Sequence, residues 1–327
     1  MMISKRERLE AAIAKELTDQ TPVALWRHFP VDDQAPETLA NSISLYQAHH
    51  DFDFVKVTPA SSFCLCDWGV EDEWQGNDEG TRVYTKRVIE TPEGWASLRD
   101  LDPKSGALGD QLHCLKLLRE RLGEDVPIIQ TIFNPLSQAK NLAGGERLFQ
   151  HLHRHPGVLK AGLEIITRST IAFIEAAVER GIDGIFYAIQ HASYRYFDEA
   201  GFQEFSEGFD LQILEAANRL WLNVLHLHGE AIMFAPAEKY PVAVVNWHDR
   251  EAEIDLMQGS VRIKGAVCGG LRRSTIALGT PEQVEAEARD AVKMMAGGGF
   301  ILGTGCVAPI ITPEANYQAV KSAIDFV

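Results

Sequence analysis

Short apolar runs alternate with longer segments of helical periodicity along most of the chain. The apolar runs predict eight strands, at residues 23–26, 54–57, 127–132, 184–188, 223–226, 242–246, 262–266 and 300–302. The longer amphipathic segments predict helices near residues 39–50, 108–122, 159–180, 202–220 and 281–296. Regular alternation of strand and helix is typical of a parallel sheet whose strands are joined by crossover helices.

Eight strand–helix units in 327 residues favour a closed (β/α)₈ barrel, the TIM barrel, as a single domain over residues 1–327. An open doubly wound sheet should carry a glycine-rich turn after its first strand, but Trp26-Arg27-His28-Phe29-Pro30 follows instead. Residues 68–89 break the alternation. They hold Gly76-Asn77-Asp78-Glu79-Gly80 between β-favouring segments, so we expect a β-hairpin inserted after the second strand.

Composition narrows the class of protein. The chain has 31 Lys+Arg, 46 Asp+Glu and a formal net charge of −15, which excludes a general attraction to nucleic acid or anionic lipid. Its apolar runs fall short of the roughly 18–20 residues that cross a bilayer, and its first residues lack the apolar stretch of a secretory signal. Five cysteines are an odd count in a long chain, which argues against a disulfide scaffold. We therefore expect a cytoplasmic enzyme with a small-molecule substrate and no nucleic-acid or membrane partner.

In a (β/α)₈ barrel the chemistry lies at the carboxyl ends of the strands, so polar residues there are the candidates for a site. Along the chain these are Arg27, His28, Asn134, Tyr187, Gln190, His191, His226, His228, Asn246, His248, Cys268 and Cys306. The concentration of histidine and cysteine predicts that one end of the barrel is chemically active.

The sharpest local motif is His226-Leu227-His228 after the fifth predicted strand. Residues at i and i+2 of an extended segment point to the same side, so both imidazoles can reach one ion. Cys306 follows the eighth strand, and Gly305 beside it allows close approach of the backbone. Two histidines and one cysteine suit zinc with an open position, which can lower the pKa of an incoming thiol. Cys268 is a candidate fourth ligand that would instead close the site, and ordinary hydrogen-bonded histidines are the alternative to a metal.

Other strand-end residues are candidates for a substrate pocket. The guanidinium of Arg27 can bind a carboxylate with two hydrogen bonds, although a structural ion pair is an equal alternative. Tyr187 and His191 are candidate catalytic residues, because they are polar residues at the end of an apolar strand. His248 belongs either to the pocket or to its rim. The candidate substrate-binding residues are Arg27, His28, Asn134, Gln190 and Asn246.

Several segments resemble the uroporphyrinogen decarboxylase superfamily. Residues 130–139 with Gly144-Gly145 are similar to its third-strand signature, residues 177–185 to its fourth-strand entry, and residues 298–302 with 312–316 to its carboxyl-terminal end. The resemblance covers most of the chain and implies a (β/α)₈ fold. It also implies one of two chemistries: decarboxylation of uroporphyrinogen without a cofactor, or zinc-dependent methyl transfer between a corrinoid protein and a thiol such as coenzyme M.

The match to the decarboxylases fails at three positions. Val31 stands in place of their second arginine, Ala60 in place of the aspartate that binds the pyrrole N–H groups, and Cys306 in place of a histidine. Ala60 has no charge with which to stabilise a protonated pyrrole.

The methyltransferase pattern, His-x-Cys followed by a distant Cys, fits better. His226 corresponds to its first ligand and Cys306 to its last, but His228 stands where that branch has cysteine. A neutral imidazole in place of a thiolate makes the centre more positive by one charge, which favours a bound thiolate but weakens it as a nucleophile. The thiol acceptor therefore stays open, and a relative that demethylates a small methoxylated or methylamine compound is equally compatible.

The sequence thus predicts a zinc-assisted methyltransferase or demethylase, with His226, His228 and Cys306 as ligands and methylcobamide carried by a partner corrinoid protein. The alternative is a uroporphyrinogen decarboxylase of porphyrin biosynthesis that forms coproporphyrinogen III without a metal, with Arg27 and Tyr187 binding the substrate. A third hypothesis is a non-catalytic barrel that binds a tetrapyrrole or corrinoid. Similarity to the decarboxylases also implies a homodimer.

Overall fold

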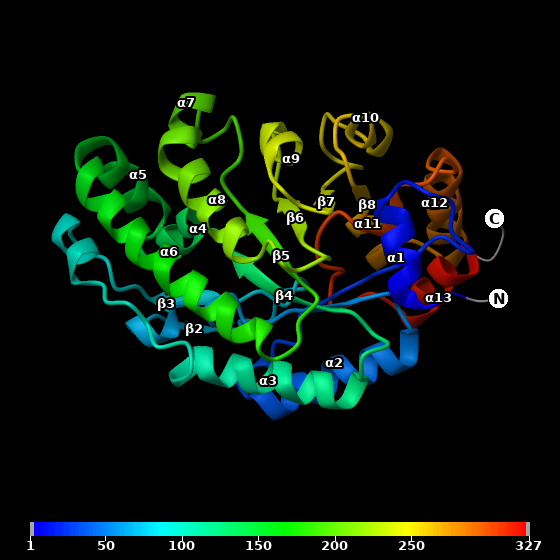
Figure 1. Ribbon diagram of the computed structural model, residues 1–327, viewed down its shortest axis with the longest axis horizontal. Coiled ribbons are helices and arrows are strands. Elements are labelled where there is room, and N and C mark those ends of the chain that lie inside the picture. The colour runs from blue at the N-terminus through cyan, green and yellow to red at the C-terminus, as the bar shows by residue number, and fades with distance from the viewer. Residues whose placement is uncertain (1–2, 325–327) are drawn as a thin grey trace.

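A curled sheet of seven parallel strands organises the computed structural model, which describes residues 3–324 (Figure 1). In the order of their pairing the strands are β1 (Val55–Val57), β4 (Ile128–Phe133), β5 (Gly184–Ile189), β6 (Val224–Leu227), β7 (Val244–Trp247), β8 (Ala266–Leu271) and β9 (Phe300–Thr304). Each strand pairs with the next one along the sheet, and the chain crosses over between them through helices.

The segment around Val23 closes this sheet into a barrel. The backbone N–H of Ala24 donates to Leu302 O at 2.9 Å, and Leu302 N–H donates to Pro22 O at 2.8 Å, so the segment joins β9. On its other side Asp53 N–H donates to Val23 O at 2.8 Å, next to the start of β1. The first predicted strand is thus a single bridge at Val23 in the eighth position of the ring. The expected TIM-barrel-like α/β fold is confirmed.

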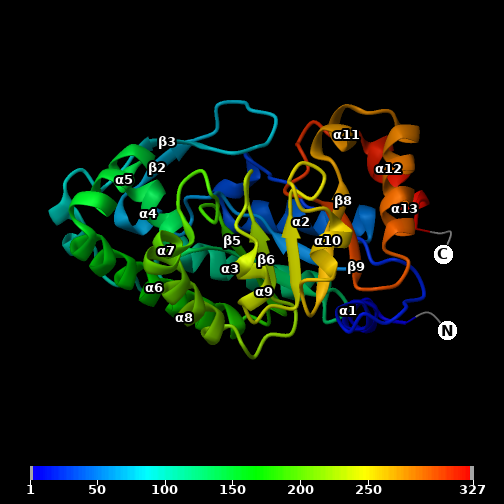
Figure 2. The same cartoon turned by 90° about the horizontal axis from the view of Figure 1, so that it is seen from above.

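Helices surround the barrel (Figures 1 and 2). The α-helices are α1 (Lys5–Ile13), α2 (Pro36–His50), α3 (Gly106–Leu122), α4 (Pro135–Ala143), α5 (Gly145–Arg154), α6 (Pro156–Val178), α7 (Glu199–Phe202), α8 (Gly208–Ala216), α9 (Ala235–Lys239), α10 (Leu256–Ser260), α11 (Arg273–Leu278), α12 (Pro281–Met294) and α13 (Glu314–Ser322). Short 3₁₀ turns occupy Asp32–Gln34, Cys66–Trp68 and Pro92–Ser97. None of the helices within residues 3–324 combines the length and apolarity that a membrane span needs.

Two more predicted elements differ from the structure. The strand expected at residues 262–266 begins only at Ala266 and continues to Leu271. The strand was not predicted because it contains two glycines, which are uncommon in strands. A Cβ at Gly269 would lie 2.3 Å from a carboxylate oxygen of Asp249, so the strand needs glycine there. The helix expected over residues 202–220 is interrupted by a π-helical turn, Gln203–Glu207, and its last regular turn ends at Ala216.

The predicted hairpin is present. β2 (Glu71–Glu73) and β3 (Val83–Lys86) pair antiparallel, and the loop between them extends over the carboxyl ends of the barrel strands (Figure 2). Ile310 N–H donates to Asp78 O at 2.7 Å, and Glu79 forms a 2.6 Å ion pair with Arg273 of α11. The insertion therefore covers part of the barrel mouth and is bound to the segments that follow β8 and β9.

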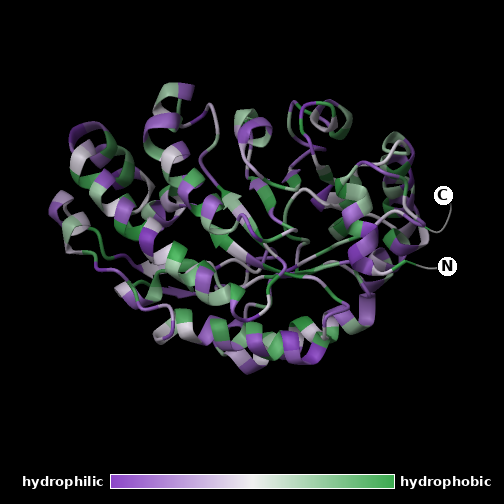
Figure 3. Cartoon of the chain, in the orientation of Figure 1, coloured by the Kyte–Doolittle hydropathy of each residue, from purple (hydrophilic) through white to green (hydrophobic). Residues whose placement is uncertain are grey.

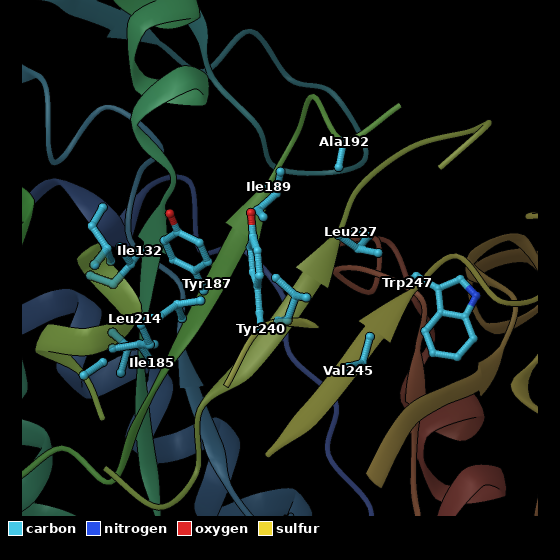
Figure 4. Close-up of a cluster of buried hydrophobic side chains, with 14 of the residues drawn as sticks. Ile132, Ile185, Tyr187, Ile189, Ala192, Leu214, Leu227, Tyr240, Val245 and Trp247 are labelled. Carbon is cyan, nitrogen blue, oxygen red and sulfur yellow. The ribbon is translucent and has the colours of Figure 1, made fainter. Parts of the chain in front are cut away.

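Alternation along each strand separates an inner core from an outer one. On β5, Phe186 and Ala188 belong to the cluster inside the barrel, whereas Ile185, Tyr187 and Ile189 belong to the cluster between the sheet and the helices (Figure 4). The barrel strands are made mostly of buried apolar residues, while polar and apolar residues alternate along the helices (Figure 3). This parity decides which strand residues can reach a site inside the mouth.

Candidate metal centre

Three histidines and one cysteine converge inside the barrel mouth. His226 lies in β6, His228 just beyond it, His248 just beyond β7, and Cys306 just beyond β9. One potential ligand atom from each of the four lies within 4.8 Å of every other. The three ligands predicted from the sequence are thus brought together, and His248 joins them.

The separations fit a shared ion. His226 Nε2 is 3.4 Å from His228 Nδ1, and Cys306 Sγ is 3.8 Å from the same His228 nitrogen. Atoms bonded to one tetrahedral zinc at about 2.0–2.3 Å lie about 3.3–3.8 Å apart. These two separations match that spacing, and every pair in the cluster lies within 4.8 Å.

The tautomer of His226 is fixed by Asn246. The side-chain NH₂ of Asn246 donates to Cys268 O at 2.8 Å and to Thr304 O at 3.0 Å, so its carbonyl oxygen must face His226. His226 Nδ1 therefore donates its proton to Asn246 Oδ1, at 2.7 Å, and Nε2 presents a lone pair to the cluster. Burial lowers the pKa of His226 and so favours the neutral ring that a metal requires, whereas an ionised Cys306 beside it acts in the opposite direction.

His248 is held in a similar way from the rim. Its Nδ1 lies 3.1 Å from a carboxylate oxygen of Glu251, while its Nε2 is buried and has no hydrogen-bond partner among residues 3–324. Buried nitrogens are normally paired, so an unpartnered one in a residue that shares a 4.8 Å cluster with a cysteine and two other histidines is in the position expected for a metal ligand.

Cys306 supplies the negative charge of the cluster. Burial alone would raise the pKa of its thiol, but His226, together with His228 and His248, outweighs that effect and holds the pKa well below its usual range. Gly305 lets this segment approach, because a Cβ there would lie 2.7 Å from His248 Cα. The close approach expected at Gly305 is therefore confirmed.

A cavity of about 250 Å³ adjoins the cluster. His226, His228 and Cys306 form part of its wall, and His28, Lys56 and Gln190 line it elsewhere. Burial lowers the pKa of His28 to about 3, so that ring is neutral at physiological pH. Of the expected pocket residues, the structure places His28 and Gln190 in the cavity wall.

Other expected pocket residues lie elsewhere. The guanidinium of Arg27 stacks over the Phe29 ring at 5.3 Å, outside the cavity, and donates to His28 O. His191 is buried against Phe149 and Tyr196 rather than lining the cavity. Asn246 contacts His226, so it positions a ligand and does not meet substrate directly.

Tyr187 and Asn134 belong to a separate network outside the barrel. Tyr187 lies on the outer face of β5, where its hydroxyl donates to Asp210 of α8 at 2.6 Å (Figure 4). Asn134 caps α4 and donates to Asp210 Oδ1 at 3.2 Å and to Ser206 Oγ at 3.0 Å. Both residues therefore lie outside the cavity wall, Tyr187 because it is on the outward-facing side of its strand.

The structure changes one further expectation and adds a residue that was not expected. Cys268, the candidate fourth ligand, is fully buried within β8 and lies outside the cluster, whereas His248 lies within it. Lys56 was missed, although a lysine inside the apolar strand 54–57 was a visible signal. It faces the cavity, with its ammonium 4.5 Å from the centre of the Phe186 ring.

Known proteins match both the chain and its fold. The family model described as uroporphyrinogen decarboxylase (URO-D) matches residues 4–326. The methylcobamide:CoM methyltransferase MtbA of Methanosarcina mazei is 26% identical, over 96% of this chain and 95% of that protein. A solved methyltransferase structure from Methanosarcina mazei superposes with a TM-score of 0.86 at 20% identity and covers 98% of both chains. A B12-independent methionine synthase from Shewanella sp. W3-18-1 shares the fold, with a TM-score of 0.57 at 12% identity over 92% of this chain and 91% of that one.

Proposed function

This chain belongs to the uroporphyrinogen decarboxylase (URO-D) family, and from the geometry of its site we propose that it is a zinc-dependent, corrinoid-linked methyltransferase. The cluster of His226, His228, His248 and Cys306 carries the proposal, because it joins one thiolate to imidazoles whose ligand atoms lie within 4.8 Å of one another. The relatives named methylcobamide:CoM methyltransferases support the same reaction class.

The four side chains would hold one zinc ion, which suits a mixed imidazole–thiolate donor set. Zinc supplies a Lewis acid that lowers the pKa of a thiol or polarises a small substrate. Three neutral imidazoles and one thiolate leave a centre with a net positive charge. Such a centre attracts anions more strongly than one with two thiolates, and this is the consequence of His228 standing where the methyltransferase branch has cysteine.

The chain's own residues prepare this centre in different ways. Asn246 holds the His226 ring with its Nε2 toward the cluster, and the imidazoles keep Cys306 ionised. A catalytic zinc site keeps one position for substrate. Of the four side chains, His248 comes from the rim, where its Nδ1 contacts Glu251, whose side chain is 41% exposed, so His248 is the ligand that a substrate would displace in this proposal.

The cavity limits what can react there. At about 250 Å³ it lies near the lower end of small-molecule pockets, which suits a compact methyl donor or acceptor. The corrinoid would be presented at the mouth by a partner protein, beside the hairpin loop. We also propose that the molecule is a single-domain enzyme.

The decarboxylase alternative finds less support in the same cavity. Among the described lining residues the one carboxylate is Glu79, which is paired with Arg273. Ala60, which stands in place of the aspartate of the decarboxylases, also lines the wall. Arg27, expected to bind a carboxylated substrate, lies outside. A substrate with eight carboxylates would meet few free cations here.

An assay of methyl transfer from methylcobalamin to a panel of small thiols tests the proposal. The absorbance change of the corrinoid measures the reaction. Zinc-loaded protein should transfer the methyl group, and a chelator should stop the reaction until zinc is restored. Cys268→Ala is the matched control for Cys306→Ala, because both remove a cysteine near the same strand ends. Metal-free conversion of uroporphyrinogen would establish the decarboxylase instead, and binding of a corrinoid without turnover would establish a non-catalytic barrel.

A further inference from the structure

The cavity beside the cluster contains positive charge that the protein does not neutralise. Its charged lining residues, apart from histidine and cysteine, are Lys56, Arg82, Lys140 and Glu79. Arg82 is paired with Asp72 at 2.9 Å, and Glu79 is paired with Arg273. Lys56 and Lys140 therefore remain, in a chain whose overall charge is −15.

Lys56 is the more deeply placed of the two. It is 6% exposed, and its ammonium donates one long hydrogen bond, 3.3 Å, to Thr58 Oγ1. Its other neighbours are the rings of Phe186, at 4.5 Å, and Trp26, at 5.9 Å. Within residues 3–324 the one anionic group that acts on it is Cys306, which the proposed zinc site would engage.

A buried ammonium without a carboxylate partner is costly, because desolvation disfavours its charged form. Burial lowers the pKa of Lys56 to about 7, which expresses that cost. Aromatic faces recover part of it, but a methionine or leucine would fill the same space without the penalty. A cation retained in this way inside a ligand cavity points to an anion that arrives with the ligand.

The position of Lys56 relative to the cluster limits the size of that ligand. The Phe186 ring contacts both: the Lys56 ammonium lies 4.5 Å from the ring centre, and His226 stacks on the ring with 5.1 Å between ring centres. A molecule lying along Phe186 can thus place an acidic group at Lys56 and its reactive atom beside His226, with a short spacer between them.

We infer that this cavity binds a small organic anion and that Lys56 is the partner of its acidic group. Lys140, for which no carboxylate acts as a partner among the described residues, adds positive charge from α4. The anion could be a mercapto acid that accepts the methyl group or a methoxylated aromatic acid that donates it. This inference deepens the proposed function and rests on it for the reaction, but the binding of an acid at Lys56 can be measured with and without zinc.

Calorimetric titration of the full chain, with and without zinc, tests the inference with two pairs of probes. The first pair is 3-mercaptopropionate and neutral 2-mercaptoethanol, and the second is 4-methoxybenzoate and neutral methoxybenzene. In one pair the acid should bind about 10- to 100-fold more tightly than its neutral partner, as expected for a hydrogen bond to a charged group. The pair that shows the difference identifies the anion as acceptor or donor.

Lys56→Met should abolish this preference, and Lys56→Arg should retain part of it. The matched control is Lys116→Met, because Lys116 lies exposed on α3 beside Glu120, away from the cavity. Lys56→Met should also unfold at the same or a higher temperature than the wild type, which shows that it folds.

Equal binding of acid and neutral probes, an unchanged preference in Lys56→Met, or no binding of either acid would overturn the inference. Failure of the proposed function is distinguishable from these results. If the acid preference persists in chelator-treated protein while methyl transfer never occurs with zinc, the anion site stands and the methyltransferase assignment falls.

Discussion

Two buried polar clusters lie at neighbouring strands but on opposite sides of the barrel wall. Outside, Asp210 accepts hydrogen bonds from Tyr187, Tyr240, Ser206 and Asn134, at 2.6–3.2 Å. Inside, the cluster around Cys306 has a histidine nitrogen with no hydrogen-bond partner among the described residues and adjoins a cavity. In the first cluster the carboxylate oxygens of Asp210 both accept hydrogen bonds from neighbouring side chains. Within residues 3–324 the second cluster leaves a buried nitrogen unpartnered, which an ion or a substrate could engage.

The difference separates structural polar groups from functional ones. A fully satisfied buried network holds neighbouring elements in one arrangement, here β5, α4, α8 and the π-helical turn. A cluster that concentrates ligand atoms and leaves one unpartnered is arranged for an ion or a substrate. Burial alone does not distinguish the two, because Asp210 and His226 are both almost inaccessible to solvent.

The largest effect should follow from removing the thiolate. Cys306→Ala leaves three neutral imidazoles, so metal affinity and methyl transfer should each fall by more than about 100-fold, beyond the loss seen for residues that only support a ligand. Zinc content after dialysis and the rate of methyl transfer measure this. Cys268→Ala should retain both, and a Cys306→Ala protein with full zinc and full activity would contradict the distinction between the clusters.

A smaller loss is expected when Asn246 no longer orients His226. Asn246→Ala frees the ring to rotate or to change tautomer, so zinc affinity should fall about 10- to 100-fold. Competition with a chromogenic chelator gives the affinity. An unchanged affinity would show that the backbone alone positions His226.

The contribution of the outer cluster to the stability of the fold should depend on pH. Burial raises the pKa of Asp210 from 3.8 to about 6, so between these values the native state keeps a proton that the unfolded chain releases. The contribution of Asp210 to the free energy of unfolding should therefore decrease as pH rises from about 4 to 6, by on the order of 3 kcal/mol, and stay constant above. Urea unfolding of the wild type and Asp210→Asn across this range isolates the effect. A difference between them that does not vary with pH would be inconsistent with the raised pKa.

The smallest effect on the proposed reaction is expected from Tyr187→Phe. Loss of its hydroxyl removes one hydrogen bond to a carboxylate, which should lower the free energy of unfolding by about 1.5–3 kcal/mol while zinc content and methyl transfer stay the same. Denaturant unfolding and the methyl-transfer rate are measured on the same preparation. A stable Tyr187→Phe protein without activity would restore the catalytic role that the sequence suggested.

The sequence was sufficient to predict the barrel, because the alternation of strands with helices is a local pattern that this fold repeats. It failed at β8, whose glycines serve a contact with Asp249 that no local pattern reveals. Proximity within the cluster was predictable for His226, His228 and Cys306, since parallel strand ends meet at one face. The role of His248 was not, because it depends on how the loop after β7 turns.

Strand parity explains the remaining errors. Tyr187 lies one residue away from the inward-facing Phe186 and Ala188, and so faces α8. Applied from the start, the same parity would have placed Lys56 in the cavity, since it alternates with the outward-facing Val55 and Val57. A single charged residue at an inward position of an apolar strand is therefore the signal to look for.

The most direct test of the central claim is the metal centre of the purified full chain. Metal analysis combined with X-ray absorption at the zinc edge should find about one zinc per chain, coordinated by one sulfur and otherwise nitrogen. Substitution of His248 by Ala should remove one nitrogen and leave the sulfur. Protein that takes up no stoichiometric zinc, or zinc bound by two sulfurs, would contradict this account.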